Sequence, residues 1–126
     1  MTEISFEDFQ KLDIRIGTVI SAEVPDWSHW VMKLTVDFSP KGRSVPGRGE
    51  DIGKKTCFAG IMKFFKPKDL IGRQFPFIIN IEPKKIGPEK QESEAMMIMA
   101  VPKDDEKTAP ILFNLEKKVP NGTKVF

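Results

Sequence analysis

The sequence of 126 residues contains one cysteine, one histidine and no tyrosine. Cys57 cannot form a disulfide within the chain, which agrees with a reducing compartment and favours a small core residue over a reactive thiol. Because His29 is the only histidine, the sequence offers no multi-histidine metal site and no Cys/His nucleophile pair at a sensible spacing. Paired carboxylates at Glu92 and Glu94 are conceivable, but a solvated strand edge is the favoured interpretation. We therefore predict a protein that is not an enzyme and holds no metal and no cofactor.

The chain also lacks long apolar runs. No run approaches the roughly 20 residues that a membrane-spanning helix requires. Residues 1–10 contain three acidic side chains and no lysine or arginine, which is the wrong charge for a signal peptide. We therefore expect a cytoplasmic protein without membrane insertion. The length fits one domain with one modest core, spanning 1–126.

Positive charge is concentrated in the middle of the chain. The net charge is only +2, yet residues 54–90 contain nine basic and three acidic side chains, while the flanking segments are mildly acidic. Solvated surface lysines would explain any one of these cations alone. Their concentration in one segment instead predicts a face that binds an anionic partner.

The N-terminal third is predicted to form a short helix and two strands. Ser5 is a suitable N-cap for a helix that places Phe6 and Phe9 on one face, which we expect to pack inward. Apolar and polar residues then alternate from Leu12 to Ile20, which predicts a long first strand. We expect Gly17 to lie at a bend or bulge of that strand.

Further alternating segments predict the remaining elements. A helix is expected at 67–70, where proline suits the first turn and Gly72 the C-terminal end. Later strands or extended segments are expected at 32–38, 56–61, 75–81, 95–101, 111–115 and 124–126, with a long loop at 39–53 that carries Lys41, Arg43 and Arg48. Five strands with a helix between the third and fourth predict an all-β Greek-key barrel.

Basic and aromatic side chains alternate directly after the third strand. Exposed RNA is held by cations that neutralise phosphates and by flat side chains on which bases stack. Lys63, Phe64 and Lys66 supply both, whereas we place Phe65 in the core. Lys84, Lys85 and Lys90 extend the positive surface.

Three further residues are candidates for contact with a ligand, and each also has a structural role as an alternative. Asn80 could read a base edge or fix the turn after a strand, and Ser93 could bond a ligand or cap the next strand. Met96 lies opposite Met97 on its strand, so one of the two faces the core and the other could contact a base or an unfolded peptide. We interpret Trp27 and Trp30 as packing anchors rather than a base-stacking platform, and their exposure stays open.

Five segments carry a resemblance to a known family. They are F-x-x-F-x-K-L-D-I-R-I-G-T-V at 6–19, L-T-V-D-F at 34–38, A-G-I at 59–61, S-E-A-M at 93–96 and V-P-N-G-T-K at 119–124. Together they resemble the tRNA-binding OB-fold domain of stand-alone tRNA-binding proteins, of the C-terminus of methionyl-tRNA synthetases and of the CsaA-type export chaperones. The resemblance implies a five-stranded OB-fold barrel with a core of about 12–101.

The resemblance also implies partners and site residues. RNA contacts are carried over to Asn80, Lys84, Lys85, Ser93 and Met96, with Lys63 and Lys66 as phosphate contacts. A homodimer would be built by segments 1–11 and 102–126, with Phe6, Phe9, Ile111 and Phe113 at its interface.

Two functions are compatible with this resemblance. One is a CsaA-like dimeric module that binds tRNA. The other is a chaperone that binds unfolded preproteins for the export machinery. Ala95 replaces the glycine that is usual in tRNA binders, and its methyl group could obstruct a nucleotide, which tilts the resemblance toward CsaA-type members.

Overall fold

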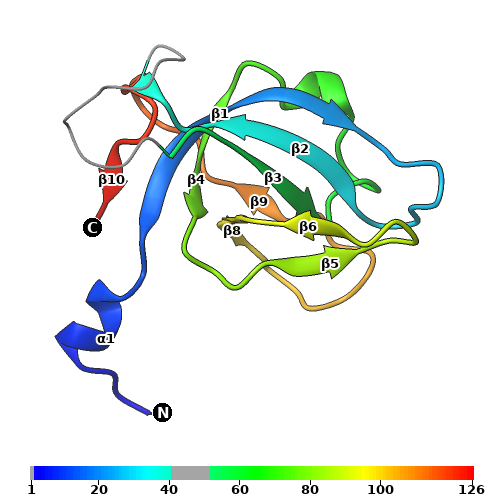
Figure 1. Ribbon diagram of the computed structural model, residues 1–126. Helices are drawn as coiled ribbons and strands as arrows, with labels where there is room; N and C mark the ends of the chain where they lie inside the picture. The colour runs from blue at the N-terminus through cyan, green and yellow to red at the C-terminus, as the bar shows by residue number, and fades with distance from the viewer. Residues whose placement is uncertain (1, 41–51) are drawn as a thin grey trace.

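The computed structural model describes residues 2–40 and 52–126, and these residues form an almost entirely β structure. Figure 1 shows a small barrel from which one short helix extends. Most of the predicted loop 39–53, with Lys41, Arg43 and Arg48, lies outside the described residues. Within the described ranges, no helix is long and apolar enough to cross a membrane.

Five antiparallel strands build the barrel in the order β3-β2-β1-β4-β7. Their bounds are Ile14–Glu23 for β1, Met32–Asp37 for β2, Lys54–Ala59 for β3, Gln74–Ile78 for β4 and Met96–Met97 for β7. The sheet nearly closes where the N–H of Glu94 donates to the carbonyl of Thr56 on β3 at 2.8 Å. This arrangement confirms the predicted five-stranded OB-fold barrel.

Short elements complete the fold. A 3-10 helix, η2, spans Pro67–Asp69 between β3 and β4, and Gly72 follows it with φ +87°. β5 (Lys84–Ile86) pairs with β6 (Gln91–Ser93), β8 (Met99–Ala100) pairs with β9 (Ile111–Leu112), and β10 (Lys124–Val125) pairs with the start of β1. The helix predicted between the third and fourth strands is therefore present, with its glycine at the C-terminal end.

The core lies between the strands that alternation predicted. Val19, Leu34, Phe75 and Phe77 are fully buried. The ring of Phe77 meets that of Phe38 edge to face, with centroids 5.6 Å apart. Cys57 is buried with them, and burial raises the pKa of its thiol to about 12. The thiol stays protonated at neutral pH, which agrees with the predicted core role.

The bulge expected at Gly17 lies elsewhere in β1. The register shift in β1 falls between Val19 and Ser21, not at Gly17. A Cβ at Gly17 would lie 2.5 Å from Cγ1 of Val36 and 2.7 Å from Phe38, so glycine is needed there because two core side chains approach the backbone.

Three strand predictions need correction. The third strand begins and ends two residues earlier than predicted, and the fourth ends at Ile78. The segment 95–101 contains two strands, because Met96–Met97 pair with β4 whereas Met99–Ala100 pair with β9. Residues 84–93 form the β5–β6 hairpin, which sequence alternation did not indicate because both strands are short and polar.

The helix α1 spans Phe6–Gln10 and starts at the predicted N-cap, where Oγ of Ser5 accepts from the N–H of Asp8 at 3.1 Å. Its phenylalanines do not pack inward as predicted. Phe6 is 70% exposed and Phe9 37% exposed, and their rings contact each other at 6.3 Å. The reason is visible in Figure 1, where α1 stands away from the barrel.

Candidate nucleic-acid interface

Two adjoining hollows share Trp30 and Gly60. The first, here called the central groove, has a volume of about 320 Å³ and is lined by Trp30, Phe58, Lys84, Ile86, Ser93, Met96 and five neighbours. The second, here called the rim pocket, has a volume of about 260 Å³ and is lined by Trp30, Gly60, Lys63, Phe64, Asp105 and Glu106. Each hollow therefore combines one lysine and aromatic side chains with acidic residues, which are Glu82 in the central groove and Asp105 and Glu106 in the rim pocket.

The β5–β6 hairpin forms one wall of the central groove and rests on Trp27. Gly87, in the turn of the hairpin, has φ +79°, and a Cβ there would lie 2.5 Å from the Trp27 indole. The indole also contacts the ring of Phe58 on β3, with centroids 6.2 Å apart. Trp27 is thus a packing anchor, as predicted. It lies between the hairpin and β3 and so positions the hairpin against the barrel.

Ser93 and Glu94 attach the end of the hairpin to β3. Oγ of Ser93 accepts from the N–H of Phe58 at 3.1 Å and donates to the carbonyl of Ala95 at 3.4 Å. A carboxylate oxygen of Glu94 accepts from the N–H of Thr56 at 3.0 Å. Ser93 therefore lines the groove while its hydroxyl holds the adjoining strands together, which favours the structural role left open for it.

The lysines on the hairpin divide between two faces. Lys84 pairs with Ser93 and lines the groove, whereas Lys85 pairs with Glu92 and does not line it. Both are exposed. Among residues 2–40 and 52–126, neither forms an ion pair, and the same holds for Lys63 and Lys66. Their positive charge is available to an anionic ligand.

Asn80 lies outside both hollows and is held by the backbone. Its Oδ1 accepts from the N–H of Asp13 at 2.9 Å, and its Nδ2 donates to the carbonyl of Lys11. These bonds fasten the segment before β1 to the end of β4, which favours the turn-fixing role.

Lys66 is exposed at the start of η2, where its N–H donates to Asp69 at 2.8 Å.

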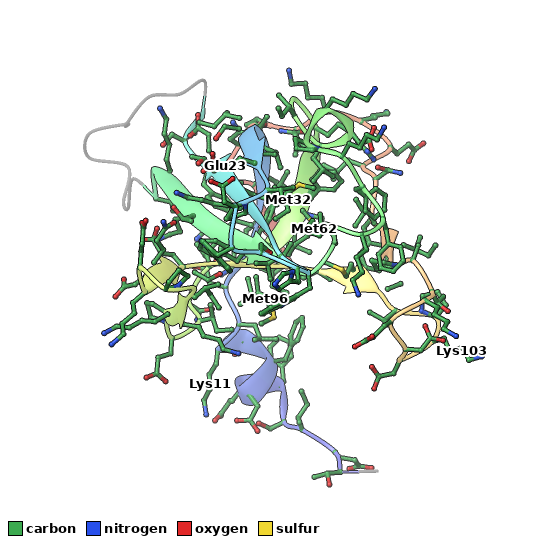
Figure 2. The ribbon with its side chains drawn as sticks, turned by 90° about the vertical axis from the view of Figure 1, so that its right-hand side faces the viewer. Lys11, Glu23, Met32, Met62, Met96 and Lys103 are labelled. Atoms are coloured by element: carbon green, nitrogen blue, oxygen red, sulfur yellow. The ribbon has the colours of Figure 1, made fainter. Side chains whose placement is uncertain are left out.

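The structure therefore brings five of the predicted residues together and leaves three apart. Those that line the hollows are Lys63, Phe64, Lys84, Ser93 and Met96; those that do not are Lys66, Asn80 and Lys85. Met96 is 50% exposed and Met97 is buried, which settles which methionine faces the core. Met96 lies near the middle of the face shown in Figure 2.

Trp30 is the residue that sequence reasoning missed. It is 55% exposed and lines both hollows, so the packing-anchor interpretation is wrong for this tryptophan. Trp27 and Trp30 both lie in the connection between β1 and β2, so position in the sequence gave no signal that separates them. Ala95 is 3% exposed and belongs to the buried core cluster, although it also lines the central groove.

The predicted dimer residues lie elsewhere. A hollow of about 410 Å³ is lined by Phe6, Phe9, Leu12, Phe126 and four neighbours, where α1 approaches β10. Ile111 and Phe113 are 56% and 46% exposed but do not line it. These apolar side chains are uncovered in the single chain.

Comparisons with known proteins agree on one family. No protein-family model matches the chain. A methionine–tRNA ligase of Archaeoglobus fulgidus is 36% identical over 98% of this chain and 16% of the ligase. The chain spans only 12% to 17% of the length of such curated ligases.

Two solved structures match along their whole length. The chaperone CsaA of Bacillus anthracis is 32% identical, with a TM-score of 0.79, and covers 99% of this chain and all of its own. A protein from Pyrococcus horikoshii described as related to methionyl-tRNA synthetase is 28% identical, with a TM-score of 0.78 and full coverage of both chains.

The barrel defines an oligonucleotide/oligosaccharide-binding fold, and the two adjoining hollows are its candidate ligand face. The chain belongs to the tRNA-binding OB-fold domain family that includes the C-terminal domain of methionyl-tRNA synthetases and the CsaA-type proteins.

Proposed function

We propose that the protein is a non-catalytic, CsaA-like module that binds structured tRNA through the central groove and the rim pocket. The observation that carries this proposal is that two adjoining hollows, which share Trp30, each place an exposed lysine, Lys84 or Lys63, beside aromatic side chains. Cations neutralise phosphates, and flat rings accept unstacked bases. Similarity to ligases that act on tRNA supports the same partner.

The other proposed contacts extend this site. Lys66 and Lys85 are exposed and unpaired within the described residues, so they can reach phosphates beside the hollows. Asn80 contributes by holding the strand end that precedes the basic hairpin. We place the protein in the cytoplasm, which agrees with the unpaired Cys57.

A second candidate function is export chaperoning. A similar structure is described as a chaperone, and Met96, which lines the groove, is 50% exposed.

One experiment distinguishes tRNA binding from chaperoning. Labelled bulk tRNA should bind with saturation in fluorescence anisotropy, and a permanently unfolded polypeptide should fail to displace it. The polypeptide should fail because it carries no phosphates with which the lysines could pair. Binding that does not saturate, or that the polypeptide displaces, would make chaperoning the leading function.

We also propose that the protein is a homodimer, with 1–11 and 102–126 as dimerisation extensions. Support comes from the exposed apolar side chains of Phe6, Phe9, Ile111 and Phe113, which are too large and too numerous to leave in water without cost. Unfolded preproteins and the export machinery would be partners of the protein only under the chaperone alternative.

The double substitution Phe6→Ser with Phe9→Ser should convert the dimer to a monomer. Burial of each phenylalanine is worth roughly 1.5–3 kcal/mol, and a two-fold interface loses four rings, so the dissociation constant should rise by at least about 10⁴-fold. Light scattering at micromolar concentration measures this. Ile71→Ser is the matched control, since Ile71 is 48% exposed but lies outside the extensions. A monomeric parent protein would refute the dimer.

A further inference from the structure

The rim pocket is lined by cationic, aromatic and acidic side chains, a combination that a simple anion such as free phosphate would not match. Trp30 and Phe64 present aromatic side chains, Lys63 presents a cation, and Asp105 and Glu106 present carboxylates. The carboxylates would repel a phosphate placed among them. A ligand that fits all five must offer a flat ring, hydrogen-bond donors and a separate negative charge.

We propose that the rim pocket binds one unstacked nucleobase that carries an exocyclic amino group. The base stacks on Trp30, its amino group donates to the carboxylates, and its phosphate lies toward Lys63. This inference rests on the proposed RNA-binding function and names the part of the RNA that the pocket selects.

The stacking surface is held in place before any ligand arrives. Ser28 is buried beneath the turn, and its Oγ accepts from the N–H of Val31 at 2.9 Å and donates to the carbonyl of Val31 at 2.7 Å. Oγ also accepts from the N–H of Trp30 at 3.3 Å, and the carbonyl of Trp30 accepts from Met62. The backbone of Trp30 is therefore fixed on both sides while the residue is 55% exposed, so a base that stacks there need not order the main chain.

The opposite wall is a tight turn. The N–H groups of Phe64 and Phe65 both donate to the carbonyl of Ile61 at 3.0 Å. Phe65 packs against the core, which leaves Phe64 half-buried at the pocket beside the exposed Lys63. This turn sets an aromatic ring and a cation next to each other, as a nucleotide requires.

The acidic edge comes from the loop between β8 and β9, which also carries Lys103 and extends from the barrel in Figure 2. Oδ1 of Asp105 accepts from the N–H groups of Thr108 at 2.7 Å and Lys107 at 2.9 Å, and these bonds hold the pKa of Asp105 below its ordinary value. Oδ2 also accepts from the hydroxyl of Thr108 at 3.2 Å, so the ionised carboxylate keeps one of its about four lone-pair sites for a ligand. Within the described part of the chain, Glu106 makes no side-chain hydrogen bond or ion pair.

Carboxylates select bases by their donors. Cytosine offers an N4 amino group, and adenine and guanine offer N6 and N2 amino groups. Uracil has no amino group and places a carbonyl oxygen where cytosine has its donor, so two carboxylates repel it. The pocket should therefore favour cytosine over uracil, two pyrimidines of nearly equal size.

The test compares short oligocytidine and oligouridine with wild-type protein and four variants, Trp30→Ala, Trp30→Phe, Glu106→Gln and Asp104→Asn. Tryptophan fluorescence and competition with labelled tRNA report binding. Trp30→Ala should weaken oligocytidine binding by about tenfold, the loss expected for one stacked base, and Trp30→Phe should restore most of it. Glu106→Gln should reduce the preference for cytosine severalfold. Asp104→Asn removes the same charge from the same loop outside the pocket and should leave the preference unchanged.

The outcomes separate the two proposals. If tRNA binds with strong salt dependence but Trp30→Ala and Glu106→Gln change neither affinity nor base preference, the pocket does not bind a base and only this inference fails. If no RNA binds at all, the proposed function fails with it. If an unfolded polypeptide quenches Trp30 and RNA does not, the pocket is a peptide site and the inference is overturned.

Discussion

Replacing Lys84 and Lys85 by glutamate should lower tRNA affinity by roughly 25-fold at 0.1 M monovalent salt. Each neutralised single-strand phosphate contributes about 0.7 to the slope of log affinity against log salt, so two lost contacts remove about 1.4 logarithmic units between 1 M and 0.1 M. Charge reversal adds repulsion to this loss. Both lysines are exposed on β5 and unpaired within the described residues, so the substitution leaves the barrel intact. Anisotropy titrations at several salt concentrations measure the effect.

The control for this variant is Lys117→Glu with Lys118→Glu. These lysines are also adjacent and exposed, and they line a separate hollow with Arg73 that shares no residue with the central groove. The change in net charge is the same. Equal losses in both variants would show that tRNA responds to overall charge and that the site is misplaced.

Gly87→Ala should destabilise the protein by about 2–6 kcal/mol and weaken tRNA binding at the same time. Alanine is strained at φ +79°, and its Cβ would lie 2.5 Å from the Trp27 indole. Strain and overpacking each cost roughly 1–3 kcal/mol. The indole cannot easily yield because it also contacts Phe58. The hairpin should therefore shift and displace Lys84 from the groove.

Gly72→Ala is the matched control for this prediction. Gly72 has φ +87°, close to that of Gly87, but a Cβ there would have nothing within 4 Å. Both variants share the backbone strain, and only Gly87→Ala adds the clash. Urea denaturation at one protein concentration should show the difference, and tRNA affinity should fall only for Gly87→Ala. Equal effects would mean that Trp27 does not position the hairpin.

The barrel could be predicted from sequence because its strands alternate strongly. Leu34 and Val36 face the core as the pattern indicated, and Ser5 caps α1 as expected. Bounds were less accurate where a strand changes partners. The apolar segment predicted as one strand is divided into β7 and β8, because β7 pairs with β4 and β8 pairs with β9.

The site was harder to predict because its parts depend on contacts between distant segments. Lys63 and Phe64 could be predicted because basic and aromatic side chains alternate in that short segment. Trp30 did not, since only the packing of Trp27 beneath Gly87 distinguishes the two tryptophans. The inward packing expected for Phe6 and Phe9 failed because a helix of five residues shows which face is apolar but not what covers it.

The salt dependence of tRNA binding by the wild-type protein tests the central claim most directly. If Lys63, Lys66, Lys84 and Lys85 each neutralise one phosphate, log affinity should fall against log salt with a slope of about −3. Anisotropy with labelled bulk tRNA between low and physiological salt measures that slope. A slope near zero, or binding that strengthens in salting-out anions, would contradict a phosphate-binding groove and indicate an apolar ligand instead.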